Sequence, residues 1–210
     1  MSKEHHIEVN LKCSYRTLNE LSPMTKRVWV VFHGYGQLTE YFLKKFEILD
    51  ASTNFILAPQ GLSKFYLQNH QRVGATWMTK EDRLTEIENQ QRYLGAVIQK
   101  EIDGFDGEVV LFGFSQGVAT MGRFATFSKM NFDHMVLWAG SFPHDLEKED
   151  LRHWPKEYRI SYFSGHDDPY IKEGLIETQE RRMEELTGKK VNAHFFEGKH
   201  EIIPELLLRI

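Results

Sequence analysis

The stretch that decides the fold is Val109-Val110-Leu111-Phe112-Gly113-Phe114-Ser115-Gln116-Gly117. It begins with an apolar, β-prone run, continues as Gly-x-Ser-x-Gly, and is followed at once by a segment compatible with a helix. This order predicts a buried strand, a sharp turn with Ser115 at its apex and a helix that begins beside the serine. Gly113 and Gly117 fit this turn, because residues two before and two after its apex come too close together for side chains.

A serine at the apex of such a turn is held in a strained backbone conformation, with its hydroxyl clear of the sheet. The N-terminus of the following helix offers backbone N–H groups where a negatively charged oxygen would form. Ser115 is therefore a candidate nucleophile. The alternative is an ordinary glycine-flanked turn, since Gly-x-Ser-x-Gly alone is a weakly specific pattern.

Apolar, β-branched runs alternate with longer amphipathic stretches along the chain. This pattern predicts an α/β fold, with a mostly parallel sheet and helices on both faces. We expect strands over His6–Tyr15, Val28–His33, Asn54–Pro59, Val109–Phe114, His134–Trp138, Ile160–Ser164 and Ala193–Phe196. We expect helices over Glu40–Asp50, Lys80–Ile102, Gln116–Met130, Glu173–Thr187 and Glu201–Leu208. No linker or repeat interrupts them, so residues 1–210 are expected to form a single domain.

The first expected strand alternates apolar with polar side chains, which is typical of an edge strand with one face in water. Its apolar members are Ile7, Val9, Leu11 and Cys13. We expect Cys13 to be a small packing residue rather than a catalytic one. The stretch Gly61–Met78 has no clear periodicity and is expected to be a loop over the carboxyl edge of the sheet, where α/β proteins keep their sites.

Composition limits the classes of partner. The chain has 210 residues, of which 41% are hydrophobic and 27% charged, and its net charge is −4. Basic and acidic residues are interspersed, which argues against nucleic acid and against a polybasic membrane anchor. The start of the chain does not resemble a signal peptide, and no run approaches the roughly 18 apolar residues of a spanning helix. The single cysteine excludes an internal disulfide, so we expect a protein of the reducing cytoplasm.

A serine hydroxyl is a poor nucleophile unless a base accepts its proton and an acid orients that base. In proteins with a serine at such a turn, the acid and then the histidine follow it in the chain, just past later strands. His200 follows the last expected strand, Ala193–Phe196, and is the candidate base. The alternative for His200 is an ordinary histidine in a surface loop.

The candidate acid lies in Gly165-His166-Asp167-Asp168-Pro169, directly after the strand expected over Ile160–Ser164. We favour Asp168 over Asp167, because Pro169 stiffens the turn that follows Asp168. The alternative is that both aspartates are solvated turn residues, since Asp is common before Pro in loops.

Two backbone donors would be needed to hold the negative charge on a substrate oxygen. The Gln116 N–H, directly after the serine, is the first candidate. The run Phe32-His33-Gly34-Tyr35-Gly36 offers the second, because its glycines let the backbone approach closely and leave the Tyr35 N–H to point inward. We expect His33 to be a structural loop residue rather than a second base.

These pieces together resemble the α/β-hydrolase superfamily and, more narrowly, the phospholipase/carboxylesterase (acyl-protein thioesterase-like) family. The resemblance spans about residues 28–210. It rests on Phe32-His33-Gly34-Tyr35-Gly36, Ala58-Pro59-Gln60-Gly61, Gly113-Phe114-Ser115-Gln116-Gly117, Gly165-His166-Asp167-Asp168-Pro169 and His200.

The resemblance implies an α/β-hydrolase fold without a large lid. It implies that Ser115 is the nucleophile, Asp168 the acid and His200 the base, and that the Tyr35 and Gln116 N–H groups form the oxyanion hole. Trp77 and Phe142 stand in segments that usually border the substrate pocket in this family, although either could equally be a core aromatic.

We therefore expect a serine hydrolase that cleaves carboxylic esters or thioesters of small-molecule acyl substrates through an acyl-enzyme, with no metal and no cofactor. The alternatives are a serine peptidase or amidase of the same fold, and a hydrolase-fold binding protein without turnover. The C-terminal helix is expected to be mostly core, but an exposed face would support a homodimer; its apolar residues are Ile202, Ile203, Leu206, Leu207 and Leu208.

Overall fold

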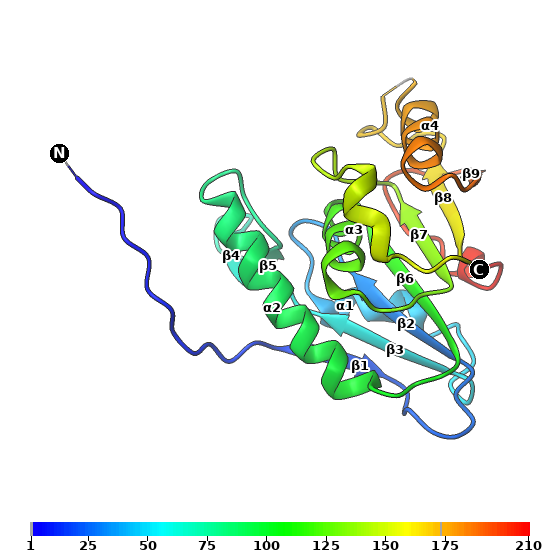
Figure 1. The fold of residues 1–210 in the computed structure, drawn as a ribbon, viewed down its shortest axis with the longest axis horizontal. Helices are drawn as coiled ribbons and strands as arrows, with labels where there is room; N and C mark the ends of the chain where they lie inside the picture. Colours follow the sequence, from blue (N-terminus) through cyan, green and yellow to red (C-terminus); the bar gives the residue numbers. More distant parts are fainter. Residues whose placement is uncertain (1, 173) are drawn as a thin grey trace.

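The computed structural model describes residues 2–172 and 174–210 (Figure 1). Its centre is a seven-stranded sheet with the order β1-β3-β2-β6-β7-β8-β9. β1 is antiparallel to β3, and the other neighbouring strands pair in parallel, which confirms the expected mostly parallel sheet. The strands are β1 Tyr15–Leu18, β2 Arg27–Phe32, β3 Asn54–Pro59, β6 Glu108–Phe114, β7 His134–Trp138, β8 Arg159–Gly165 and β9 Val191–Phe196.

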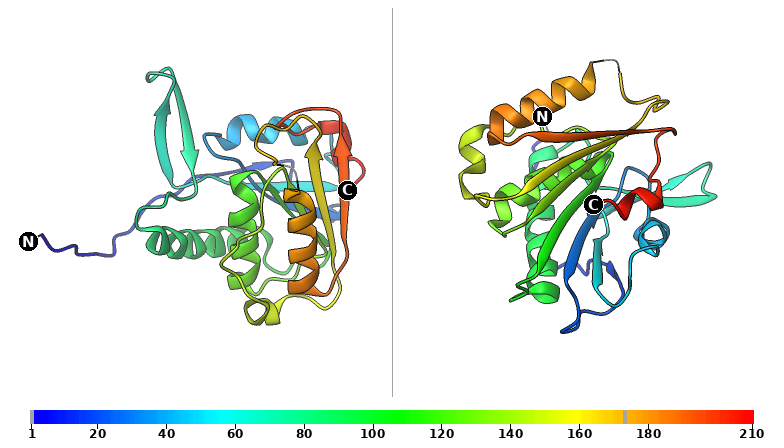
Figure 2. Two further views of the ribbon diagram at one scale, coloured as in Figure 1. Left: turned by 90° about the horizontal axis from the view of Figure 1, so that it is seen from above. Right: turned by 90° about the vertical axis from the view of Figure 1, so that its right-hand side faces the viewer.

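Helices cover both faces of this sheet (Figures 1 and 2). On one face lie α2 (Arg83–Ile102), α3 (Gln116–Ser128), α4 (Leu175–Thr187) and a 3-10 helix, η2 (Lys148–His153). On the other lie α1 (Thr39–Phe42), a 3-10 helix, η1 (Leu43–Phe46), and α5 (Pro204–Leu207). None of the helices in the described part of the chain has the length and apolarity needed to cross a bilayer.

The central strands are apolar throughout because each of their faces packs against a different helix layer. Along β2, Val28 and Val30 belong to the core beneath α2 and α3. The intervening Trp29 and Val31 belong to the core beneath α1 and α5. The two cores together fix the position of β2 and its neighbour β6, whose carboxyl ends carry the loops described below.

The chain leaves β2 and β6 in opposite directions along the sheet. From β2 it passes to β3 on one side, and from β6 it passes to β7, β8 and β9 on the other. In open α/β sheets, ligands bind outside the carboxyl ends of the strands at such a switch point. The Ser115 turn follows β6, and the loop that begins at His33 follows β2, so both lie at this position.

The N-terminal strand is much shorter than the alternating pattern predicts. Of the strand expected over His6–Tyr15, only Tyr15 is part of a strand, and the residues before it run away from the body of the protein (Figure 1). The reason is the length of β3, because its last residue, Pro59, lies opposite Tyr15. Beyond that point a single backbone bond, from the Gln60 N–H to the Ser14 carbonyl at 3.2 Å, continues the pairing within the described residues.

The expected loop Gly61–Met78 contains an antiparallel hairpin of β4 (Ser63–Leu67) and β5 (Arg72–Thr76), which projects from the body (Figure 2). Its turn carries three successive residues with positive φ, at 50°, 50° and 69°, and none is glycine. A hairpin turn is recognised in sequence mainly by its glycine, so this one gave no signal. The Gly36 N–H donates to the Ala75 carbonyl at 2.8 Å, which joins the base of the hairpin to the loop after β2.

Two expected helices are shorter than predicted. The segment Glu40–Asp50 forms α1 and then η1, in which Leu43 and Phe46 are three residues apart and both buried. The segment Glu201–Leu208 is helical only from Pro204, because a residue before proline is held out of the helical region. Ile203 accordingly has φ −92° and ψ 108°.

The other helices differ from expectation at their ends. α2 begins after Asp82, which has φ 45°, and α3 ends before Lys129, which has φ 53°. Left-handed residues such as these interrupt a right-handed helix. The expected first residue of α4, Glu173, lies outside the described residues.

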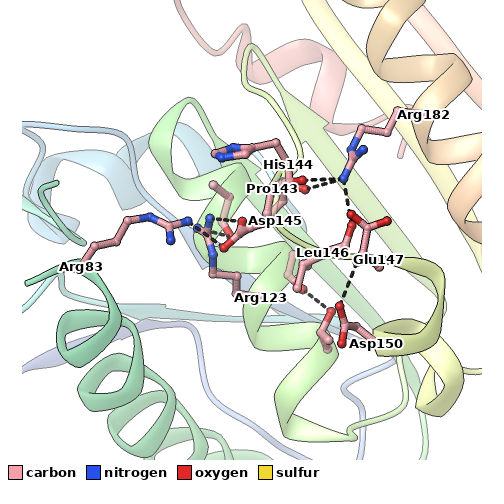
Figure 3. A network of polar contacts seen from close by, with 12 residues as sticks. Arg83, Arg123, Pro143, His144, Asp145, Leu146, Glu147, Asp150 and Arg182 are labelled. Atoms are coloured by element: carbon pink, nitrogen blue, oxygen red, sulfur yellow. Dashed lines mark hydrogen bonds and ion pairs between the residues drawn. The ribbon is translucent and has the colours of Figure 1, made fainter.

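A network of charges anchors the loop between β7 and η2 (Figure 3). The Arg123 side chain on α3 is only 5% exposed and bonds the Asp145 carboxylate at 2.7 Å. Arg83, at the start of α2, bonds the same carboxylate at 2.7 Å. Arg182 on α4 donates to the carbonyls of His144 and Leu146 at 2.9 and 2.8 Å. Three helices therefore hold one loop.

Asp145→Asn is expected to lower the free energy of unfolding by about 3 kcal/mol, because it leaves the buried Arg123 guanidinium without a counter-charge. Arg83→Gln is the matched control. It removes the more exposed partner of the same carboxylate and is expected to cost less than about 1 kcal/mol. Urea unfolding curves of both variants at neutral pH measure the two values, and equal losses would contradict this account.

The stabilisation by Asp145 is expected to disappear in acid. Burial alone would raise the pKa of this carboxyl, but hydrogen bonds from Arg123 and Arg83 outweigh burial and hold the pKa well below its ordinary value of 3.8. A carboxyl with a lowered folded-state pKa stabilises fully above its unfolded pKa and loses that effect as the pH falls through the folded value. The difference between wild type and Asp145→Asn should therefore shrink below pH 3.8; a growing difference would contradict it.

Candidate active site

Ser115 lies between β6 and α3 with φ 54° and ψ −119°. Such a backbone conformation costs on the order of 1–3 kcal/mol for a residue with a side chain. The Ser115 N–H donates to the Trp138 carbonyl at 2.9 Å, which ties the turn to β7. A Cβ atom on Gly117 would lie 2.1 Å from the Phe32 carbonyl oxygen, and one on Gly140 would lie 2.3 Å from the Ser115 carbonyl oxygen. The turn is tight in the way that the Gly-x-Ser-x-Gly spacing predicts.

The structure brings Ser115, His200 and Asp168 into one hydrogen-bonded chain. The His200 Nε2 lies 2.9 Å from the Ser115 Oγ, and the His200 Nδ1 lies 2.7 Å from the Asp168 Oδ2. Because an ionised carboxylate can only accept, the Nδ1 must carry the proton in this contact. The Nε2 is then free to accept the proton of the serine hydroxyl.

Asp168 is buried, and each of its carboxylate oxygens has a partner. Its side chain has no exposed surface, and its Oδ1 accepts the Tyr170 N–H at 2.9 Å. Asp167, the alternative acid, is exposed, and its backbone N–H donates to the Gly198 carbonyl at 3.0 Å. The structure therefore brings Asp168, and not Asp167, to the histidine.

Close backbone contact between the loops after β8 and β9 brings Asp168 and His200 together. A Cβ atom on Gly165 would lie 2.4 Å from the Gly198 carbonyl oxygen and 2.6 Å from that of Lys199. The His166 N–H also donates to the Phe196 carbonyl at 2.9 Å. Glycine at position 165 is therefore required for the acid and the histidine to meet.

The His200 ring contacts two aromatic rings that sequence reasoning did not single out. Its centroid is 4.9 Å from that of Phe114 and 4.7 Å from that of Tyr170. Tyr170 thus contacts the histidine with its ring and the acid with its backbone N–H. The Tyr170 side chain is 71% exposed, so it also forms part of the outer rim of the site. In the sequence, only the position of Tyr170 two residues after Asp168 indicates that it belongs to the site.

The two expected oxyanion donors lie in neighbouring segments, at the start of α3 and in the loop after β2. Gln116 is the first residue of α3, where an N–H has no partner within the helix. No hydrogen bond is found for the Tyr35 N–H within residues 2–172 and 174–210. The close approach of Gly117 to the carbonyls of Phe32 and His33 places the two loops side by side.

His33 anchors the loop that carries Tyr35. Its Nε2 accepts the Gly61 N–H at 2.9 Å, so the proton of the neutral ring resides on Nδ1, which donates to the Gly34 carbonyl at 2.8 Å. Burial lowers the pKa of His33 to about 4, although its bond to the Gly34 carbonyl acts in the opposite direction. A ring that remains neutral and is already bonded on both nitrogens is a structural group and has no free nitrogen to act as a base.

The Gln116 side chain has a structural role that its sequence position does not reveal. Its Oε1 accepts the Trp77 N–H at 3.2 Å, and its Nε2 donates to the Met78 carbonyl at 3.0 Å and to the Thr76 hydroxyl at 2.8 Å. Gln116 therefore also holds the C-terminal end of β5 against the turn that carries Ser115.

The two residues considered for the substrate pocket, Trp77 and Phe142, are both buried, with 1% and 2% of their surface exposed. The Trp77 ring stacks on His33 at 4.7 Å, and its indole N–H donates to the His33 carbonyl at 2.7 Å. Phe142 packs against Trp154, with centroids 6.0 Å apart. Contact of either residue with a substrate stays a prediction.

One group of side chains in the described ranges has ligand atoms close enough together for a metal ion. It consists of Glu4, His6 and Asp82, and all three are exposed. Exposed acidic groups commonly lie together without a metal, so this group gives no reason to assign one.

Stability is expected to fall as the pH drops from about 6.5 to about 4, because unfolded His33 binds a proton in that range and folded His33 does not. The expected loss from this residue is up to about 3 kcal/mol. His33→Asn retains a donor that can reach the Gly34 carbonyl but does not titrate. It should lower stability at neutral pH and flatten the pH dependence, which urea unfolding across this range measures; an unchanged slope would contradict the assignment.

Comparison with known proteins supports the fold and identifies the family. The structure is similar to acyl-protein thioesterase 2 from Zea mays, with a TM-score of 0.70, 14% identity and coverage of 94% of this chain and 96% of that one. For the esterase PE8 the TM-score is 0.70, the identity 19% and the coverage 95% and 96%. For the Bacillus cereus carboxylesterase the values are 0.65, 16%, 92% and 89%. At these identities the likeness establishes the α/β-hydrolase fold.

No curated protein sequence matches the chain. The model of the phospholipase/carboxylesterase family, however, matches residues 16–210. This range contains all seven strands of the sheet apart from Tyr15, the first residue of β1. The chain therefore belongs to the phospholipase/carboxylesterase family of ester hydrolases.

Proposed function

We propose that this protein is a serine hydrolase that cleaves carboxylic ester or thioester bonds of small acyl substrates. Ser115 is the nucleophile, His200 the base and Asp168 the acid. The observation that carries the proposal is the continuous hydrogen-bonded chain from the Ser115 Oγ through both His200 nitrogens to the buried Asp168 carboxylate. Family membership supports the choice of the ester bond.

In the proposed first step, the Ser115 Oγ attacks the substrate carbonyl carbon while its proton passes to the His200 Nε2. The carbonyl oxygen becomes negatively charged and is held by the N–H groups of Tyr35 and Gln116. Each such donor contributes on the order of 3 kcal/mol to the transition state. The Asp168 carboxylate stabilises the imidazolium that forms.

The tetrahedral intermediate then collapses. The bond to the leaving alcohol or thiol breaks, and that group takes the proton from the His200 Nε2, which leaves an acyl group on Ser115. Water enters in place of the leaving group, gives a proton to the same nitrogen and attacks the acyl carbon. The second collapse releases the acid and returns the proton to Ser115.

Two features of the site suit this cycle. The Tyr170 N–H holds the carboxylate oxygen that His200 does not use, so the acid keeps one orientation while the histidine gains and loses a proton. The rings of Phe114 and Tyr170 restrict rotation of the imidazole. A fixed ring lowers the entropy that must be lost to reach the transition state.

The choice of bond rests on family membership, and two other readings give different outcomes. A serine peptidase or amidase would hydrolyse aminoacyl amides as well as esters. A binding protein without turnover would not label with an active-serine reagent. We also propose that residues 1–210 form a single domain, as the continuous sheet from β1 to β9 suggests, and that the protein acts in the cytoplasm.

Ser115→Ala is expected to lower kcat/KM for p-nitrophenyl acetate and butyrate by about 10⁴-fold or more, because removal of the nucleophile leaves only the contributions of binding and the oxyanion donors. The wild type, but not the variant, should label with a fluorophosphonate probe. Equal unfolding curves for the two proteins serve as the control. A wild type that neither labels nor turns over any acyl substrate would contradict the proposal.

Asp168→Asn and Asp167→Asn form a matched pair of variants, since the two residues are adjacent and the substitutions identical. Asp168→Asn is expected to lower kcat by about 10³–10⁴-fold, because an amide no longer fixes the histidine tautomer. Asp167→Asn, on an exposed side chain, should stay within about twofold of wild type. The reverse order would make Asp167 the acid.

A further inference from the structure

The segment from His6 to Ser14 has the sequence of an edge strand but no strand to pair with. Its apolar side chains are among the most exposed of the protein, with Ile7, Val9 and Leu11 at 88%, 77% and 69%. Within residues 2–172 and 174–210, no hydrogen bond is found for any backbone N–H from His6 to Cys13. An exposed, alternating and unpaired strand edge is a template for another strand.

We propose that the partner of this segment is the same segment of a second copy of this chain. The two segments pair in antiparallel register with Asn10 opposite Asn10. Because each segment continues into β1, the seven-stranded sheet of one copy is joined to that of the other through a two-stranded ribbon. The predicted N-terminal strand then forms, with the partner subunit supplying the neighbour that β3 is too short to provide.

The charges of the segment and the alternation of its apolar and polar side chains select this register. With Asn10 at the centre, Glu8 of each copy lies opposite Lys12 of the other, which gives two pairs of opposite charge. The same register places Val9 opposite Leu11 and Ile7 opposite Cys13, so that apolar side chains share one face. A shift of the centre by one position in the chain separates Glu8 from Lys12 and places neutral or histidine side chains opposite them. A register centred between two neighbouring residues places every apolar residue of the segment opposite a polar one.

The segment runs beside α2, which Glu8 contacts through Arg92. Cys13 and Tyr15, at the end of the segment, pack against the core beneath α2. The segment and α2 enclose a groove whose walls include Val9, Leu11 and Val97. In the proposed dimer the second strand covers apolar side chains that a single strand leaves in water.

The contacts between the segment and its own body are too weak to compete with such pairing. The Arg92 guanidinium lies 3.0 Å from the Glu8 carboxylate, and the His6 ring 3.7 Å from that of Asp82. All four side chains are at least 42% exposed, and exposed ion pairs contribute between nothing and about 1 kcal/mol. They align the segment along α2 and leave its backbone unbonded to the body up to Cys13. Among the described residues of the segment, only the Ser14 carbonyl accepts hydrogen bonds from the body, from the Tyr93 hydroxyl and the Gln60 N–H.

The segment is long enough to keep the two sheets apart. Tyr15, where the sheet begins, is five positions from Asn10, so the sheet of each copy starts about 17 Å from the two-fold axis at roughly 3.4 Å per residue. The segment also extends away from the sheet (Figures 1 and 2). The C-terminal helix is a weaker interface, since Leu207 and Ile202 are core residues and Leu208 alone of its apolar residues is exposed.

A disulfide tests the register directly, because Cys13 is the only cysteine of the chain. Ile7→Cys creates a thiol opposite the partner's Cys13 and should give a covalent dimer under mild oxidation at low micromolar concentration. Val9→Cys is the matched control: it lies on the same face but opposite Leu11, and should crosslink at least about fivefold less. Equal crosslinking of the two variants, or crosslinking of Ile7→Cys that persists when Cys13 is replaced by Ser, would overturn the register.

Charge reversal tests the proposal without cysteines. In an Arg92→Ala background, which removes the contact of Glu8 with its own body, Glu8→Lys or Lys12→Glu alone should weaken the dimer by about tenfold. The double reversal should restore it, as sedimentation equilibrium measures. A monomeric wild type at tens of micromolar, or a dimer that none of these changes affects, would overturn the proposal. The readout is mass, so failure here is independent of failure of the proposed hydrolase activity.

Discussion

The contact on which the site depends is the approach of the Ser115 turn to the end of β2. A Cβ atom on Gly117 would lie 2.1 Å from the Phe32 carbonyl oxygen, so backbone touches backbone across two parallel strands. This contact fixes the serine, the Gln116 N–H and the loop that carries Tyr35 relative to one another. The strained, positive-φ conformation of Ser115 persists because the surrounding sheet leaves the turn no alternative path.

Buried polar groups carry this constraint outward. His33 forms hydrogen bonds to the loops that follow β2 and β3, and the Trp77 ring stacks on its imidazole. The Gln116 side chain connects the serine turn to the hairpin. Each of these groups has its hydrogen bonds satisfied, which makes a buried polar network rigid rather than costly. The site is thus held by groups that do not themselves take part in the proposed chemistry.

Sequence predicts those parts of this structure that depend on local patterns. The strands over Asn54–Pro59 and His134–Trp138 form as predicted, because continuous apolar runs between polar boundaries specify strands buried on both faces. The serine, the acid and the histidine are also found from local patterns, because each stands shortly after a recognisable strand. The roles of the Gln116 side chain and of Tyr170 depend on contacts with other segments, and the β4–β5 turn has positive φ without glycine, so none of these has a local signature. The strand predicted at His6 failed for lack of a partner within the chain.

The placement of His200 has a consequence for how the protein would lose function. Ser115 follows a central strand, whereas His200 follows β9, the outermost strand of the sheet, which has neighbours on one side only. Strands at the margin of a sheet open with less free energy than those at its centre. Under mild denaturation or modest heating, the edge strand would detach and remove the imidazole while the serine turn and the central strands remained folded. Inactivation would then be a local and reversible event that precedes the cooperative unfolding of the sheet.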